Sequence, residues 1–221
     1  MSDIIFSVRR HEEKDGDALT NWGIQRAIYT GELLGQTIDP LLVNSCGYHS
    51  KAQRTRQTLN LLFTGAGLNE EYIQKNISES PLLSLDTSSI PKEELNEMVK
   101  LGDTELVNAL LANYPEFMKR TGENVLQHIK NVYSKFKNEN GPTRGFYIEN
   151  VTHCPAVESA LIQLVDPSLR DIKYFGGAFN QGENFRIVLK DSSQCFGHNA
   201  YLDFRGNHVK TNNMCWRKDL E

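Results

Sequence analysis

Short apolar runs alternate with longer amphipathic stretches along most of the chain. Buried strands are predicted for the apolar or β-branched runs at 3–8, 40–46 and 145–153. Apolar residues at helical spacing predict a helix after each strand, at 20–35, 51–67 and 155–165. This alternation indicates an α/β protein, a three-layer α/β/α sandwich with a mostly parallel central sheet.

Two further regions complete the pattern. The stretch 87–140 is almost wholly helical in character and predicts a helical insert or cap between the second and third strand–helix units. The segments 183–191 and 199–206 predict closing strands. The chain contains no repeat, low-complexity segment or linker, so we expect a single domain over residues 1–221.

Composition narrows the classes of partner. Lys and Arg number 24 against 28 Asp and Glu, a net charge of −4 that argues against nucleic acid or an anionic membrane surface as partner. No apolar run approaches the ~18 residues of a membrane span, and the first residues do not resemble a signal peptide. The four cysteines are scattered and interpreted as reduced thiols, so we expect a cytoplasmic protein.

Basic side chains follow each of the three predicted strands. The first strand is followed by Arg10 and His11, the second by Ser50 and Arg54, and the third ends at His153. Ligands of open α/β sheets bind beyond the carboxyl ends of the strands. We therefore expect two arginines and two histidines to converge at one edge of the sheet, near helix N-termini that favour anions.

This combination of side chains suits a phosphoryl group. A guanidinium is always charged and matches the geometry of phosphate oxygens. A neutral imidazole can attack phosphorus and form a phosphohistidine, while the arginines stabilise the charge on the transferred group. The arginines supply the positive field, and the histidine and cysteine spacing matches no zinc pattern, so no metal or other cofactor is predicted.

Four motifs in order resemble the histidine phosphatase superfamily, the phosphoglycerate mutase-like branch one. Its RHG, LTxxGxxQA, SxxxRAxQT and THG signatures are similar to RRHEE (9–13), LTNWGIQRA (19–27), SKAQRTRQT (50–58) and THC (152–154). Arg26 stands in place of a glutamine. The resemblance covers most of the chain outside 87–140.

The resemblance implies a metal-independent phosphomonoester hydrolase in which His11 is the nucleophile. Arg10, Arg54 and His153 would then bind the phosphoryl group of a small phosphorylated substrate or a phosphoprotein. A phosphomutase of the same fold and a non-catalytic phospho-ligand-binding or regulatory protein remain as alternatives. The oligomeric state is left open.

The leaving group needs a proton donor, usually a carboxylic acid with a raised pKa. The resemblance places this acid in the region 76–89, where we favour Asp86 over Glu79, with Glu12 and Glu13 as further alternatives. Ser50 is a further predicted substrate-binding residue.

Two departures from the motifs stand next to the predicted site. Glu12 and Cys154 occupy positions where the family usually has glycine. A carboxylate at position 12 would oppose anion binding unless it points away or pairs with a base. Lys14, also predicted to bind substrate, is our candidate for that base. Arg9 lies outside the matched positions and is interpreted as solvated or salt-bridged.

Overall fold

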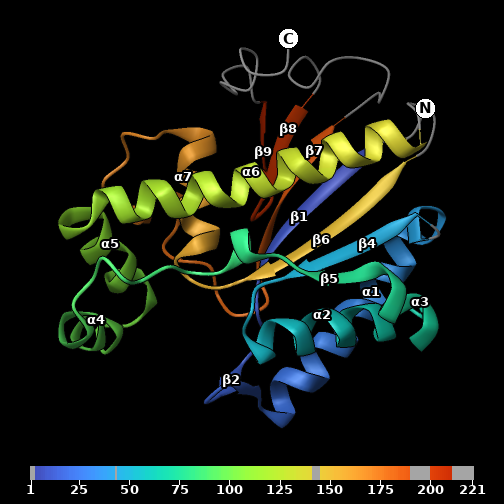
Figure 1. Ribbon diagram of the computed structural model, residues 1–221, viewed down its shortest axis with the longest axis horizontal. Coiled ribbons are helices and arrows are strands. Elements are labelled where there is room, and N and C mark those ends of the chain that lie inside the picture. Colours follow the sequence, from blue (N-terminus) through green and yellow to red (C-terminus); the bar gives the residue numbers. More distant parts are fainter. Residues whose placement is uncertain (1–2, 43, 141–144, 190–199, 211–221) are drawn as a thin grey trace.

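The protein forms a seven-stranded sheet in the order β5-β4-β6-β1-β7-β8-β9 (Figure 1). The computed structural model describes residues 3–42, 44–140, 145–189 and 200–210. The strands of this sheet are β1 (Ile4–Arg10), β4 (Ser45–His49), β5 (Ile77–Glu79), β6 (Phe146–Thr152), β7 (Asn184–Leu189), β8 (Ala200–Phe204) and β9 (Asn207–Lys210). Neighbours among β5, β4, β6 and β1 are parallel, and the remaining pairs are antiparallel. The predicted mostly parallel α/β sheet is confirmed.

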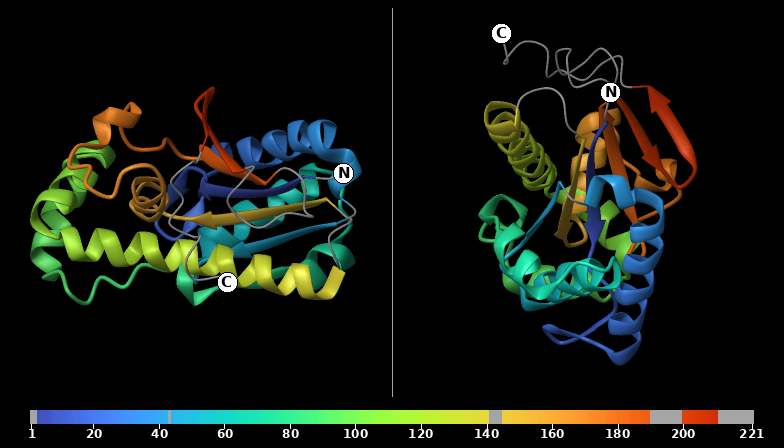
Figure 2. Two further views of the ribbon diagram at one scale, coloured as in Figure 1. Left: turned by 90° about the horizontal axis from the view of Figure 1, so that it is seen from above. Right: turned by 90° about the vertical axis from the view of Figure 1, so that its right-hand side faces the viewer.

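Helices lie on both faces of this sheet (Figure 2). They are α1 (Asn21–Leu42), α2 (Gln53–Gly65), α3 (Glu70–Asn76), α4 (Lys92–Val99), α5 (Asp103–Asn113), α6 (Pro115–Asn140) and α7 (Ala156–Val165). A small hairpin of β2 (Lys14–Asp15) and β3 (Ala18–Leu19) follows β1. Within the described residues, no helix is both long and apolar enough to span a membrane.

Alternation along the central strands sorts their side chains between the two helical layers. Phe6 and Val8 of β1 belong to the core cluster that also contains residues of α6 and α7. Tyr147 and Val151 of β6 pack instead with residues of α1 and α2. Since successive side chains of a strand point to opposite faces, the next residues of β1, Arg9 and Arg10, enter different surroundings.

The second predicted strand is placed too early along the chain. The prediction of a strand at 40–46 is wrong for its first half, because α1 continues to Leu42 and β4 begins at Ser45. Non-helical dihedral angles at Ile38 (φ −125°, ψ 18°) divide α1 into two pieces. Pro40 therefore falls in the first turn of the second piece, where its missing N–H is not needed.

The stretch 87–140 is helical as predicted, but its helices differ in position. Val125 and Ile129 of α6 are fully buried in the main core cluster, so α6 is a layer of the sandwich. The start of α5 lies instead at the carboxyl edge of the sheet, where Asp103 contacts Arg10 at the end of β1. The insert thus contributes both to the core and to the edge where the candidate site lies.

Candidate active site

His11 lies immediately after β1, with its imidazole fixed by one backbone group. Its backbone N–H donates to the carbonyl oxygen of Thr152 at 3.0 Å, which ties it to the end of β6. Its Nδ1 lies 2.7 Å from the carbonyl oxygen of Glu12, which can only accept, so we assign the ring proton to Nδ1. The lone pair of Nε2 then faces outward and accepts from Nε of Arg54 at 3.2 Å.

His153, after the end of β6, faces the same arginine. Nη2 of Arg54 donates to Nδ1 of His153 at 3.2 Å, and the His11 and His153 ring centroids are 5.4 Å apart. Nε2 of His153 therefore carries the proton and donates to Oγ of Ser50 at 2.7 Å. Ser50 in turn lies 2.9 Å from Oγ1 of Thr55, so its hydroxyl orients His153 through a buried hydrogen-bond chain.

Both imidazoles are neutral at pH 7. Burial, followed by the charges of Arg54 and Arg10, lowers the pKa of His11 to about 4, although the hydrogen bond to Glu12 opposes the shift. Burial and then Arg54 lower the pKa of His153 to about 3. A neutral His11 keeps Nε2 unprotonated, which is the form that a nucleophilic imidazole requires.

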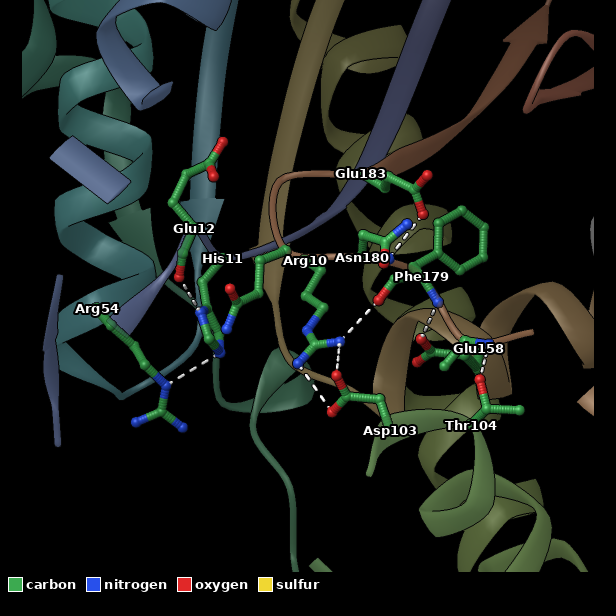
Figure 3. Close-up of polar contacts among 12 residues, drawn as sticks. Arg10, His11, Glu12, Arg54, Asp103, Thr104, Glu158, Phe179, Asn180 and Glu183 are labelled. Carbon is green, nitrogen blue, oxygen red and sulfur yellow. Dashed lines mark hydrogen bonds and ion pairs between the residues drawn. The ribbon is translucent and has the colours of Figure 1, made fainter. Parts of the chain in front are cut away.

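Arg10 ends β1 on the face toward α5 and α7 (Figure 3). Its Nη1 donates to the carbonyl oxygen of Phe179 at 2.7 Å and to Asp103 at 2.8 Å, while Nη2 donates to the other oxygen of Asp103 at 3.0 Å. The guanidinium lies between His11 and Asp103 in Figure 3. Arg10, His11, Arg54 and His153 are therefore brought together as predicted at the carboxyl edge of the sheet.

Arg9 points to the opposite face and forms a buried ion pair. Its Nε lies 3.0 Å from Glu149 of β6, and both side chains are almost fully buried. Ser7 donates to the same carboxylate at 2.8 Å, and the hydroxyl of Tyr147 also donates to it. Of the two interpretations of Arg9, the salt-bridged one is confirmed and the solvated one is wrong.

Glu12 turns its carboxylate away from His11 and Arg54 (Figure 3). The carboxylate is buried against Gly182, whose φ of +79° and lack of a side chain leave the space, because any Cβ there would overlap it. Nε of Arg26 lies 3.5 Å from the carboxylate. Burial raises the pKa of Glu12, and the charge of Arg26 opposes this shift.

The base that partners Glu12 is therefore Arg26, and the prediction of Lys14 in that role is wrong. Lys14 is exposed in the β2–β3 hairpin, where its ammonium lies 3.5 Å from the carbonyl oxygen of Gly16. Its charge still contributes to the lowered pKa values of both site histidines. Glu12 and Arg26 are both departures from the motifs, and the structure places them next to each other.

Within the part of the chain that the structure describes, neither of the two favoured proton donors makes a hydrogen bond or an ion pair with the four residues of this cluster. Asp86 is largely exposed, accepts hydrogen bonds from the hydroxyl and backbone N–H of Ser88, and lies 3.8 Å from Arg120. The Ser88 hydrogen bonds lower the pKa of Asp86, which contradicts the raised pKa expected of a general acid. Glu79 is exposed at the end of the edge strand β5, paired in register with His49 of β4.

Sequence reasoning missed three carboxylates near the cluster. Asp103 binds Arg10, and Asp17 binds Nη1 of Arg54 at 2.7 Å. Glu158 of α7 is fully buried, accepts from the backbone N–H of Phe179, and has its pKa raised to about 7 by burial. No motif marks these residues, and only the positions of α5 and the hairpin in space bring the two aspartates to the arginines.

Cys154, the second departure, is no nucleophile at neutral pH. Burial and then the Glu158 carboxylate raise the pKa of its thiol well above the usual range. Within the described ranges, no group of three or more His, Cys, Asp or Glu side chains is arranged to hold a metal ion.

Solved structures with the same fold include mutases and a phosphatase. A phosphoglycerate mutase from Bacillus anthracis matches with a TM-score of 0.61 at 16% identity, over 93% of this chain and 94% of that one. A phosphoglycerate mutase from Plasmodium falciparum matches with a TM-score of 0.50 at 17% identity, over 93% and 92%. The mycobacterial glucosyl-3-phosphoglycerate phosphatase in complex with inorganic phosphate matches with a TM-score of 0.56 at 15% identity, over 94% and 98%.

No protein-family model matches the sequence, and the curated proteins contain no match. The class defined by the structure is an α/β protein with a mixed, largely parallel central sheet. More particularly, the chain has the fold of these phosphoglycerate mutases and of the glucosyl-3-phosphoglycerate phosphatase.

Proposed function

We propose that this protein is a metal-independent phosphomonoester hydrolase that acts through a phosphohistidine on His11. The observation that carries the proposal is the buried, neutral imidazole of His11, whose Nε2 faces the guanidinium of Arg54. Its Nδ1 proton is held by a backbone carbonyl, so the free electron pair has a fixed direction. The phosphatase with the same fold was solved in complex with inorganic phosphate, which supports a phosphoryl ligand for this protein.

In the proposed reaction, Nε2 of His11 attacks phosphorus and the bond to the ester oxygen breaks. The electron pair of that bond remains on the leaving oxygen, which takes a proton from a general acid. Glu79 stays the predicted residue for this role. Guanidinium N–H groups of Arg10 and Arg54 bind the phosphoryl oxygens. These fixed donors stabilise the negative charge that develops on the oxygens during transfer, and they do so more strongly where water is excluded. Water then cleaves the P–N bond and releases inorganic phosphate.

A phosphomutase is the second candidate function, because two of the structures with this fold are phosphoglycerate mutases. A mutase returns the phosphoryl group to its substrate instead of transferring it to water. The two functions are distinguished by supplying 2- and 3-phosphoglycerate and comparing interconversion with phosphate release. A regulatory phospho-ligand-binding protein would bind these compounds and turn over none of them.

The proposal is tested with p-nitrophenyl phosphate in the presence of a chelator. We expect phosphate release by the unchanged protein and loss of at least about a thousandfold in His11→Ala, because the nucleophile is removed. His208→Ala is the matched control, since His208 is an exposed histidine of β9. Equal activity of the His11 variant and the control would overturn the mechanism.

A further inference from the structure

The N–H groups of Arg10 can be counted and assigned one by one. A guanidinium has five, and Asp103 accepts one from Nη1 and one from Nη2. The carbonyl oxygen of Phe179 accepts the second N–H of Nη1. Nε is buried and has no hydrogen-bond partner among the described residues. The two remaining donors, on Nε and Nη2, lie side by side on one edge of the guanidinium.

Arg54 shows the same division between its two edges. Its Nε and Nη2 face the two imidazoles, and its Nη1 is bound by Asp17. In both arginines the Nε–Nη2 edge is therefore the one not taken by an aspartate. The side chain of Asp17 is 60% exposed, and one of its oxygens binds Arg54, whereas both oxygens of Asp103 bind an arginine that is nearly buried. Of the two aspartates, Asp103 fixes its arginine more completely.

Asp103 is itself held by the local structure. It is the first residue of α5, directly after Gly102, whose φ of +91° forms the bend that begins the helix. Oγ1 of Thr104 accepts from the backbone N–H of Ala178 at 3.1 Å, which ties this helix start to the segment that supplies the Phe179 carbonyl. The helix start and that segment thus bind the end of Arg10 from two sides.

We propose that Asp103 is a positioning residue for phosphate binding: it holds the outer end of Arg10 so that the Nε–Nη2 edge is free for phosphoryl oxygens. This inference rests on the proposed phosphate site and adds a residue that none of the motifs contains. A bidentate carboxylate–guanidinium contact fixes both the position and the rotation of the planar group. The buried, unpartnered Nε is then the donor that the anion would satisfy.

A competing role for Asp103 would predict the opposite change in phosphate affinity when its carboxylate is removed. If the carboxylate merely competed with phosphate for Arg10, its removal would tighten anion binding, as would the loss of any nearby negative charge. If it positions Arg10, its removal weakens anion binding although a negative charge has been removed. The sign of the change therefore separates positioning from competition.

The experiment measures the Kd of inorganic phosphate by calorimetry for the full chain and for Asp103→Asn. We expect Kd to rise roughly tenfold, as for loss of one charge-assisted contact, and the KM for p-nitrophenyl phosphate to rise with it. Glu105→Gln is the control, because Glu105 lies in the same first turn of α5 and is not a partner of Arg10. We expect its Kd to stay within about twofold of the unchanged protein.

If Asp103 acts by positioning Arg10, the effect of Asp103→Asn on phosphate binding depends on the presence of Arg10. A general disturbance of α5 would act whether or not Arg10 is present. In an Arg10→Lys background the planar contact is absent, so Asp103→Asn should weaken phosphate binding no further. Asp103→Ser, which also suits a helix start, replaces the Asn variant if that variant does not fold. An unchanged or lower Kd in the Asp103 variant, or an equal loss in both backgrounds, would overturn the inference. Phosphate binding with no turnover by any variant would instead contradict the proposed hydrolysis alone.

Discussion

Two groups of charged side chains are built on the consecutive residues 9–12, and they differ in how their charges are satisfied. The buried cluster consists of the Arg9–Glu149 ion pair and of Glu12, whose carboxylate forms a second ion pair with the partly exposed Arg26. The pocket consists of Arg10, His11, Arg54 and His153. Each of its arginines forms an ion pair with a half-exposed aspartate. The Nε–Nη2 edge of Arg54 faces the histidines, and Nε of Arg10 has no hydrogen-bond partner among the described residues.

The difference follows from strand alternation. Arg9 points to the face that carries Glu149 of the neighbouring strand, which is paired in register with Ser7, and Arg10 points to the other face. Removal of one member of a buried ion pair leaves the other charge buried and unpaired, so single changes in the buried cluster destabilise the fold. The pocket keeps donors and an electron pair available for a ligand. We therefore expect changes in the buried cluster to alter stability and changes in the pocket to alter phosphate binding.

The largest expected effect is on stability, from Arg9→Met. This change leaves the Glu149 carboxylate buried without its cation, which costs about 3–5 kcal/mol. Arg10→Met should cost less, because its partner Asp103 is half exposed and can be hydrated. Urea unfolding of both variants checks the comparison. A smaller loss for Arg9→Met than for Arg10→Met would show that the two regions are not divided as described.

The second prediction concerns the pH dependence of the free energy of unfolding. The pKa values of His11 and His153 are about 4 and 3 in the folded protein, below the ordinary value of 6.5. Their stabilising effect is therefore complete above about pH 6.5 and is lost as the pH falls toward the folded pKa values. The loss is about 3 kcal/mol for His11 and about 5 kcal/mol for His153.

His128 is also buried with a pKa of about 4 and contributes in the same direction. The contribution of His11 is isolated by His11→Asn, which should lose about 3 kcal/mol less stability between pH 7 and pH 4 than the unchanged protein. Denaturant unfolding at a series of pH values measures this difference. Parallel pH profiles for the two proteins would contradict a neutral, buried imidazole at position 11.

The smallest expected effect comes from the second ion pair of the buried cluster. Arg26→Gln removes the cation next to Glu12, but the Arg26 side chain is 39% exposed, so solvent screens the pair and we expect a loss of about 1 kcal/mol. Glu12→Gly in the same chain should restore part of this loss, because the buried carboxylate is then absent. Thermal melts of the single and double variants measure the coupling, and purely additive effects would contradict it.

Most of the fold and the centre of the site could be predicted from the sequence. The short apolar runs and the residues that follow them place Arg10, His11, Arg54 and His153 at one edge, because parallel strands direct their carboxyl ends together. The strand at 40–46 was misplaced because apolar residues that end a helix resemble a buried strand over so short a run.

The partners of the site residues could not be predicted in the same way. Asp103 is separated from Arg10 by 93 residues, and the pairing depends on where α5 begins in space. Asp86 accepts hydrogen bonds from its own neighbour, Ser88, which lower its pKa, and no motif in the sequence shows this contact. The Glu12–Arg26 pair joins two departures from known motifs, and two unusual residues in one sequence do not by themselves show that they are in contact.

The most direct test of the account is detection of a phosphorylated imidazole on His11. The protein is mixed with p-nitrophenyl phosphate, quenched in alkali within milliseconds, digested and analysed by mass spectrometry. We expect a phosphate group on the peptide that contains His11, and none on that peptide in His11→Asn. Turnover with no phosphorylated His11, or phosphorylation at another residue with equal yield in the variant, would contradict the central claim.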